Sequence, residues 1–112
     1  MPVWPTRPVD EQDCLTLRSW QVFQLSSGDL HLVGYCVENR EGRVSSVVRE
    51  IDVNNMRART RSGRTYALTG RPGFNRDAGH VWERWVALNA ADAWEDITNS
   101  IWQQHVDSLD SM

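Results

Sequence analysis

Along the first two thirds of the chain, apolar residues occur in short runs rich in β-branched and aromatic side chains, separated by turn-forming residues. Such runs predict strands at residues 15–25 and 30–37, joined by a turn at 26–29. A second predicted turn at 38–43 leads into a third run at 44–53. The apolar residues of that run also fit a helical spacing, but their β-branched density favours a strand.

A hairpin is predicted next, because residues 56–61 and 64–69 flank Ser62-Gly63 in the pattern of a tight two-residue turn. The segment 70–73 contains two glycines and a proline and breaks this pattern. Beyond it the apolar residues recur with the helical period of about 3.6 instead of the strand period of about 2. The pattern therefore predicts that the sheet ends at 70–73.

Two amphipathic helices are predicted in the last third of the chain. Asp77 is the expected N-cap of the first helix, which should end near Asn89. Its apolar stripe consists of Ala78, Val81, Trp82, Trp85 and Leu88. Asp92 and Glu95 form a pair like a capping box at the start of the second helix. Its stripe consists of Trp94, Ile97, Thr98, Ile101, Trp102 and His105.

These elements predict an α+β fold in which an antiparallel sheet of about five strands is followed by two C-terminal helices packed on one face. A length of 112 residues suits a single hydrophobic core. Prolines at positions 2, 5 and 8 predict an extended N-terminal arm over residues 1–13. We therefore expect one α+β domain at 14–106, with a frayed C-terminus at 107–112.

The sequence contains neither a recognisable export signal nor a membrane-spanning segment. The first residues lack a basic region followed by an apolar run, and no stretch of about 18 apolar residues occurs. We expect a cytoplasmic protein that does not associate with a membrane. In that compartment Cys14 and Cys36 are expected to be free thiols rather than a disulfide.

Apart from histidine, every cationic side chain is an arginine: the chain has twelve and no lysine. A GC-rich bacterial genome explains this bias, so a single arginine carries little functional information. Six of the twelve nevertheless lie between residues 54 and 76, a segment without any acidic residue. They are Arg57, Arg59, Arg61, Arg64, Arg71 and Arg76.

This arginine-rich segment predicts a positive hairpin face. In a strand Arg57, Arg59 and Arg61 point to one side, and a two-residue turn places Arg64 and Tyr66 opposite them. Guanidinium groups interleaved with an aromatic ring suit phosphates or unpaired bases. The plainer interpretation is an exposed strand whose charges discourage sheet-to-sheet aggregation. The net charge of −3 argues against strong nonspecific binding to DNA.

Acidic residues are concentrated in the C-terminal third instead, where Arg84 is the one arginine after residue 77. Among them Asp92, Glu95 and Asp96 are candidates for contact with a cationic groove of a partner protein, in imitation of nucleic acid. Helix capping and a solvated helix face explain them more simply. A homodimer, in which the basic hairpin of one protomer docks on the acidic helices of another, would use both patches.

No catalytic or metal-binding motif is present. The three histidines and two cysteines are dispersed and form no CxxC or HExxH pattern, and no serine stands in a G-x-S-x-G elbow. We expect no enzyme activity, no cofactor and no metal. The remaining enzymatic alternative is a site assembled from dispersed residues such as His31, Asp52 and Cys36.

Several short segments together resemble a group of known proteins. They are Leu32-Val33-Gly34-Tyr35, Gly42-Arg43-Val44-Ser45-Ser46, Ser62-Gly63-Arg64-Thr65-Tyr66-Ala67-Leu68, Pro72-Gly73, and Asp77-Ala78 with Val81-Trp82 and Trp85. Over roughly residues 17–90 the chain is similar to small proteins, without assigned activity, of proteobacterial phages, plasmids and integrated elements. The resemblance implies no catalytic residue. It implies an accessory protein that blocks or redirects a host system such as CRISPR defence.

The sequence leads to two functional hypotheses. The first is a small non-enzymatic interaction protein, an anti-CRISPR-like inhibitor that occupies a surface of a host nucleic-acid-handling complex. Its contacts would come from the predicted hairpin face, or from the acidic residues at the start of the second helix. The second is a direct single-stranded nucleic-acid-binding module that uses the same hairpin, with Tyr66 as a stacking platform.

Overall fold

The computed structural model describes residues 13–89, 91 and 93–110. The arm expected at 1–13 lies outside these residues except for Asp13, and Asp92 lies outside them as well. The described chain has an α+β structure with a mostly antiparallel sheet and two helices toward the C-terminal end, as the sequence predicts. Neither of these two helices is long and apolar enough to cross a membrane.

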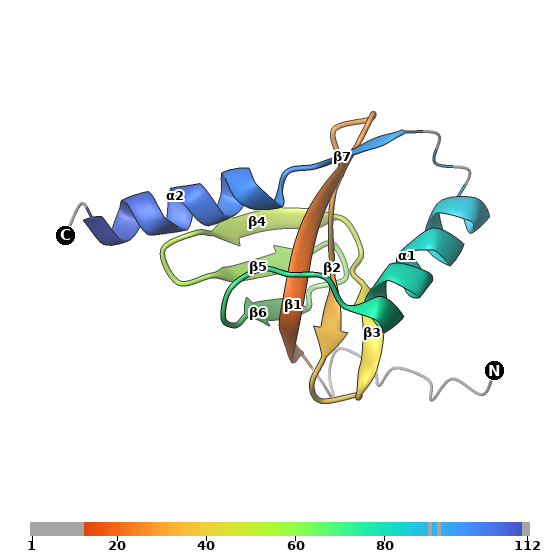
Figure 1. Ribbon diagram of the computed structural model, residues 1–112, viewed down its shortest axis with the longest axis horizontal. Helices are drawn as coiled ribbons and strands as arrows, with labels where there is room; N and C mark the ends of the chain where they lie inside the picture. The colour runs from red at the N-terminus through yellow and green to blue at the C-terminus, as the bar shows by residue number, and fades with distance from the viewer. Residues whose placement is uncertain (1–12, 90, 92, 111–112) are drawn as a thin grey trace.

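The first three strands form an antiparallel meander (Figure 1). They are β1 (Cys14–Leu25), β2 (Leu30–Cys36) and β3 (Glu41–Val44). The predicted strands at 15–25 and 30–37, and the turn between them, are confirmed. The second turn is shorter than the predicted 38–43, because β3 begins within that range.

A second antiparallel meander follows. It consists of β4 (Val48–Asp52), β5 (Arg57–Thr60) and β6 (Thr65–Leu68). The run at 44–53, predicted to be one strand, is therefore divided between β3 and β4. Ser45 lies at the division, where its buried hydroxyl accepts a hydrogen bond from the Leu32 amide and donates one to the Ser46 carbonyl oxygen. The Leu32 amide thus binds a side-chain oxygen instead of a backbone carbonyl oxygen, and the pairing of β2 with β3 ends there.

One sheet joins both meanders in the strand order β3-β2-β1-β6-β5-β4. The sheet is mixed, because β6 pairs in parallel with the first part of β1. A short strand, β7 (Trp94–Asp96), pairs antiparallel with the last part of β1. The sheet thus has seven strands instead of about five, and it does not end at 70–73. It curls so that β4, at one end of the order, comes close to β2.

A bulge in β1 decides which of its side chains face the core. The pairing of β1 with β2 shifts by one residue between Arg18 and Gln21, and Ser19 there has a positive φ of 48°. The extra residue reverses the alternation of side chains. Leu17 before the bulge and Trp20 after it therefore enter the same core cluster.

The two helices cover opposite faces of the sheet (Figure 1), so the prediction that both pack on one face is wrong. They are α1 (Arg76–Leu88) and α2 (Thr98–Asp110). Ile101 of α2 belongs to the same core cluster as Val22, whereas Trp82 of α1 packs with the next residue along β1, Phe23. Because β1 and β2 are apolar on both faces, one covered face would leave the other in water.

The N-cap of the first helix lies two residues before the predicted one. Asn75 is the N-cap: its backbone is extended, and its side-chain oxygen accepts a hydrogen bond from the Ala78 amide at 2.9 Å. Asp77 instead lies in the first turn, where a negative charge suits the helix dipole. The C-terminal boundary is as predicted, with Leu88 as the last helical residue and Asn89 as the C-cap.

The second helix begins later than predicted. Residues 94–96 form β7, so the capping box predicted from Asp92 and Glu95 is wrong. The Asp96 carboxylate, two residues before the first helical residue, instead accepts hydrogen bonds from the amide and hydroxyl of Thr98. The helix then continues to Asp110, through residues that the sequence pattern predicts to fray.

Gly42 of β3 allows α1 to pack directly on the strand. An added Cβ would lie 2.3 Å from the Ala78 amide nitrogen and 2.4 Å from the Asp77 carbonyl carbon. Gly42→Ala should therefore lower the free energy of unfolding in urea by about 3 kcal/mol, because backbone must move. Gly73→Ala is the control, since its Cβ would have 3.8 Å to the nearest atom. Equal losses in both variants would contradict this account.

The Glu38 carboxylate joins the end of β2 to the start of β1. It accepts hydrogen bonds from the amide and hydroxyl of Thr16, both at 2.7 Å. Burial raises the pKa of Glu38, but these hydrogen bonds together lower it by a larger amount. The pKa of Glu38 therefore lies below the ordinary value of 4.5. The stabilisation is thus complete above about pH 4.5 and is lost as the pH falls through the lowered pKa of the folded state.

Glu38→Gln is accordingly expected to destabilise the protein by about 1 kcal/mol at neutral pH. The difference from the wild type should shrink as the pH falls below 4.5, where the wild-type carboxylate becomes protonated. Urea unfolding across the acid range measures this, with Glu95→Gln on an exposed side chain as the control. A difference that does not change with pH would rule out the carboxylate as the cause.

Candidate interaction surface

Three tryptophans meet where α1 approaches β7 and the sheet. Trp82 and Trp85 are both on α1, and their rings stack with centroids 5.2 Å apart. Trp94 of β7 meets Trp82 edge to face at 5.6 Å. Phe23 of β1 lies 4.8 Å from Trp82, and His31 of β2 lies 4.5 Å from Trp85. We call Phe23, His31 and these three tryptophans the tryptophan cluster.

The tryptophan cluster is partly open to solvent. Trp82 is only 4% exposed, whereas Trp94 is 44% exposed. The Nε1 of Trp82 is buried and has no hydrogen-bond acceptor among the described residues. A buried donor without an acceptor is uncommon and costs about 1–3 kcal/mol. The tryptophan cluster therefore combines a buried ring with one unpaired N–H group, that of Trp82, and an exposed ring, that of Trp94.

The exposure of Trp94 is not foreseen by the sequence pattern, which places it in the core of a second helix. Trp94 is exposed because it belongs to a short strand at the edge of the sheet. The pattern does contain a signal that would have found this. Asp96 precedes Ile97 and Thr98 in the manner of an N-cap, and choosing it as the cap leaves Trp94 outside the helix.

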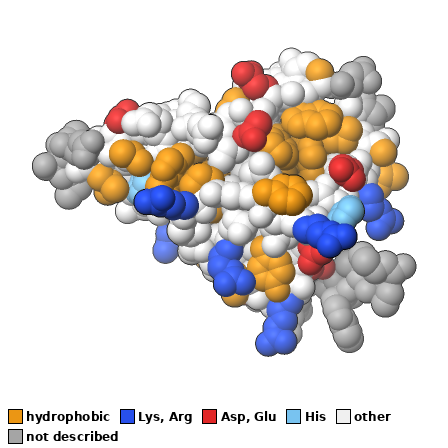
Figure 2. Space-filling view, in the orientation of Figure 1, with side chains coloured by type: hydrophobic (Ala, Val, Ile, Leu, Met, Phe, Trp, Pro, Cys, Tyr) orange, Lys and Arg blue, Asp and Glu red, His pale blue; other side chains and the backbone are white. Residues whose placement is uncertain are grey.

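Acidic side chains border the tryptophan cluster. Figure 2 shows hydrophobic side chains gathered over α1 and β7, with acidic side chains at their margin. Glu83, Glu95 and Asp96 are exposed and adjoin cluster tryptophans or lie within two residues of one. The prediction that Glu95 and Asp96 lie at the start of a helix is wrong, because both lie on a strand. Asp92 lies outside the described residues. Glu95 and Asp96 nevertheless follow Trp94 directly in β7.

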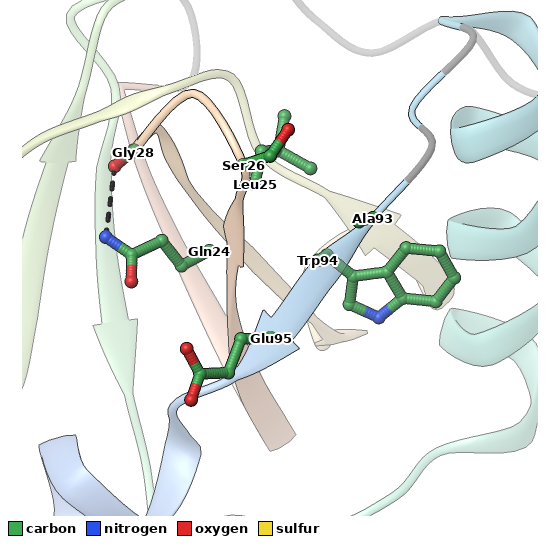
Figure 3. A pocket seen from close by; sticks show the side chains of 7 residues that line it. All are labelled: Gln24, Leu25, Ser26, Gly28, Ala93, Trp94 and Glu95. Atoms are coloured by element: carbon green, nitrogen blue, oxygen red, sulfur yellow. Dashed lines mark hydrogen bonds between the residues drawn. The ribbon is translucent and has the colours of Figure 1, made fainter.

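An open pocket of about 440 Å³ lies between β7 and the turn that joins β1 to β2 (Figure 3). Its lining consists of Gln24, Leu25, Ser26, Gly28, Ala93, Trp94 and Glu95. Figure 3 shows the ring of Trp94 directed toward α1 and the carboxylate of Glu95 directed away from it. Trp94 therefore belongs both to the tryptophan cluster and to the wall of this pocket.

The predicted positive face is partly neutralised by the neighbouring strand. Arg57 and Arg59 of β5 are exposed and stand opposite Asp52 and Glu50 of β4. Arg59 forms an ion pair with Glu50. Hydrogen bonds from Asn55, and to a smaller extent the charge of Arg57, lower the pKa of Asp52. The arginine-rich segment alone does not reveal this, because the opposing carboxylates come from the preceding strand.

Arg64 and Tyr66 do not lie on that face. The chain reverses through three residues instead of the predicted two: the Thr60 amide donates to the Arg64 carbonyl oxygen, and Gly63 has a φ of 89°. One additional loop residue moves every side chain of β6 to the opposite face. Arg64 is consequently 6% exposed and Tyr66 1%. The Tyr66 hydroxyl accepts a hydrogen bond from Arg43 Nε at 2.8 Å.

The other arginines of the segment are spread over the surface. Arg61 is exposed in the loop between β5 and β6, and Arg76 is the first residue of α1. Arg71 lines a second open pocket of about 360 Å³ beside α2. The remaining lining residues are Asn54, Asn55, Met56, Leu68, Gly70, Trp102 and His105. His105 is held there by a hydrogen bond from Nδ1 to the Val53 carbonyl oxygen at 2.6 Å.

His31, Asp52 and Cys36 are not assembled into one site. His31 and Cys36 lie near opposite ends of β2, and Asp52 is exposed at the end of β4. His31 is buried, and its Nδ1 donates to the Ser45 carbonyl oxygen at 2.8 Å. Burial raises the pKa of the Cys36 thiol, which disfavours the nucleophilic thiolate. Cys36 and Cys14 are both free, as expected.

Within the described residues, no group of three or more His, Cys, Asp or Glu side chains is placed to hold a metal ion. No family model, curated protein or solved structure matches this chain.

The difference in burial between two cluster tryptophans predicts different effects of truncation. Trp82→Ala should lower the free energy of unfolding by about 4 kcal/mol, because the ring is almost fully buried. Trp94→Ala should cost only about 1 kcal/mol, because much of its indole is already in water. Urea unfolding followed by far-UV circular dichroism measures both values. A similar loss in the two variants would mean that Trp94 serves the core instead of a surface.

Proposed function

We propose that this protein binds a partner protein through the tryptophan cluster and acts by occupying the partner's surface, without chemistry of its own. The proposed partner is a nucleic-acid-handling complex in the cytoplasm of a bacterial host, CRISPR-type as the resemblance implies. The observation that carries the proposal is the 44% exposed indole of Trp94, which packs on Trp82 and is followed in β7 by the exposed Glu95.

The exposed indole has the properties of a binding anchor. Tryptophan is among the residues that contribute most to protein–protein binding energy, particularly where it is surrounded by groups that exclude water. Trp94 is already positioned by its edge-to-face contact with Trp82. A preordered ring loses little conformational entropy when a partner covers it. The adjoining pocket provides space for an apolar group of that partner.

The charges around the anchor indicate the chemistry of the partner. The exposed side chains next to the cluster tryptophans include three carboxylates, Glu83, Glu95 and Asp96, against one guanidinium, Arg84, so this part of the surface has a net negative character. Complementary charge favours the association of such a surface with a cationic one. Proteins that hold nucleic acid present cationic surfaces to its phosphates. An acidic and aromatic surface is therefore suited to cover a site that would otherwise receive nucleic acid.

The direct nucleic-acid-binding hypothesis has less support. Its proposed stacking platform, Tyr66, is 1% exposed and hydrogen-bonded to Arg43, so a base reaches its ring only if the sheet opens. Arg59 is paired with Glu50, which reduces its attraction for phosphate. Arg57 and Arg61 are the exposed arginines of the hairpin that the second hypothesis would still use.

Affinity capture from nuclease-treated host lysate, followed by mass spectrometry, tests the proposed function. We expect the wild type to retain one protein complex and Trp94→Ala to retain at least about tenfold less of it. Leu109→Ala is the matched control, because Leu109 is also exposed (56%) but lies near the end of α2. It should behave as the wild type.

The same experiment identifies the competing outcomes. If Trp94→Ala retains the complex but the double variant Arg59→Glu, Arg61→Glu loses it, the binding surface is the hairpin and the tryptophan-cluster proposal is wrong. If the wild type recovers mainly nucleic acid, and nuclease or moderate salt removes it, the direct nucleic-acid-binding hypothesis is correct instead.

A further inference from the structure

We propose that the partner contributes an extended cationic segment that pairs with the free edge of β7 as an additional strand. This inference rests on the proposed function and specifies how the tryptophan cluster binds. It requires an unpaired strand edge, an apolar contact beside that edge, and a charge pattern that selects a cationic segment over a second copy of this chain.

The hydrogen-bond pattern of β7 defines its free edge. In the pairing with β1, the Ala93 carbonyl oxygen accepts from Ser26 N and the Ile97 amide donates to Val22 O. Antiparallel strands direct alternate residues toward the same neighbour. Ala93, Glu95 and Ile97 thus direct their backbone groups toward β1. Trp94 and Asp96 direct theirs away from it.

The outward backbone groups of β7 are unpaired among the described residues. β7 has β1 as its single strand neighbour, and no backbone hydrogen bond joins the amide or carbonyl of Trp94 or Asp96 to another described residue. Such an edge is a template for another strand. The first part of β1 pairs with β6, and β5 pairs with the other edge of β6. β7 pairs with the last part of β1, and no further strand pairs with the other edge of β7 among the described residues.

The side chains beside this edge supply one apolar and one acidic contact. The indole of Trp94 lies on the α1 side of β7, and the carboxylate of Glu95 lies on the other side (Figure 3). Among the described residues Glu95 has no ion-pair partner, whereas the Asp96 carboxylate is bound to Thr98. Directly paired strands bring opposite side chains within about 5 Å. An added strand would therefore place an apolar or guanidinium group on Trp94 and a cation beside Glu95.

A second copy of this chain fits the same edge poorly. If two β7 strands paired antiparallel about a twofold axis, one Glu95 carboxylate would lie opposite the other. Like charges directly opposite each other destabilise strand pairing. The acidic side chains thus protect the edge against self-association and attract a cationic segment.

Amide hydrogen exchange measured by NMR tests strand addition directly. The probe is an acetylated and amidated eight-residue peptide of alternating arginine and valine. At saturating peptide, exchange of the Trp94 and Asp96 amides should slow by at least about tenfold, because a strand would accept their hydrogen bonds. The Glu95 amide, which already faces β1, should change little. The same peptide with an N-methyl group on every backbone amide, which blocks both of its edges, should produce no protection.

Two charge variants separate a specific contact from general attraction to an acidic protein. Glu95→Arg should weaken peptide binding by at least about tenfold. Asp107→Arg changes the net charge equally but lies near the end of α2, and it should leave binding close to that of the wild type. Equal losses in both variants would show attraction by net charge alone and would overturn the inference.

The outcomes distinguish this inference from the proposed function. If the peptide binds, but the Trp94 and Asp96 amides exchange as before, strand addition is wrong while the tryptophan cluster remains a binding surface. The same holds if the peptide does not bind and lysate capture still requires Trp94. Protection of these amides in the protein alone, increasing with protein concentration, would identify a second copy as the occupant and refute the cationic segment.

Discussion

Strand β1 is buried on both of its faces, and the positions of both helices follow from that burial. A strand with apolar side chains in two layers needs a helix on each side, and α1 and α2 meet this need from opposite faces. The bulge at Ser19 keeps Leu17 and Trp20 in one layer although they are three residues apart. Without that extra residue, the side chains after it would exchange layers, and neither helix would find a continuous apolar surface.

The unequal lengths of the strands explain where the candidate surface arises. β1 has twelve residues, whereas the parallel strand β6 has four and covers only its first part. The chain returns after α1 to cover Phe23 to Leu25 of the same edge with β7. Because no further strand follows in the described chain, β7 becomes an edge, and Trp94 is left between the sheet, α1 and solvent. The proposed binding surface is thus a consequence of how this edge is completed.

Pairing between strands also reduces the positive charge that the arginine-rich segment presents at the surface. Its charges look uncompensated along the chain, yet β4 places Glu50 and Asp52 opposite Arg59 and Arg57. One additional loop residue then directs Tyr66 into the core. Charge segregation in sequence is therefore weak evidence for charge segregation on a surface, because strands from elsewhere in the chain contribute half of each cross-strand pair.

Local patterns of residues were enough to predict several of the elements. Alternating apolar residues and a turn mark β1 and β2, and a 3.6-residue stripe ending near Asn89 marks α1, because these patterns depend on neighbours within one or two turns. The loop length between β5 and β6, the division of 44–53 into two strands and the strand character of 94–96 were decided by tertiary structure. Each depends on a partner distant in sequence: β1 for β7, β2 for the break at Ser45, and the core for Tyr66. The cap-like position of Asp96 can place Trp94 outside the helix. Its exposure at a sheet edge nevertheless belongs to this second group, since a three-residue strand has too few side chains to show a period and its edge position depends on pairing with β1.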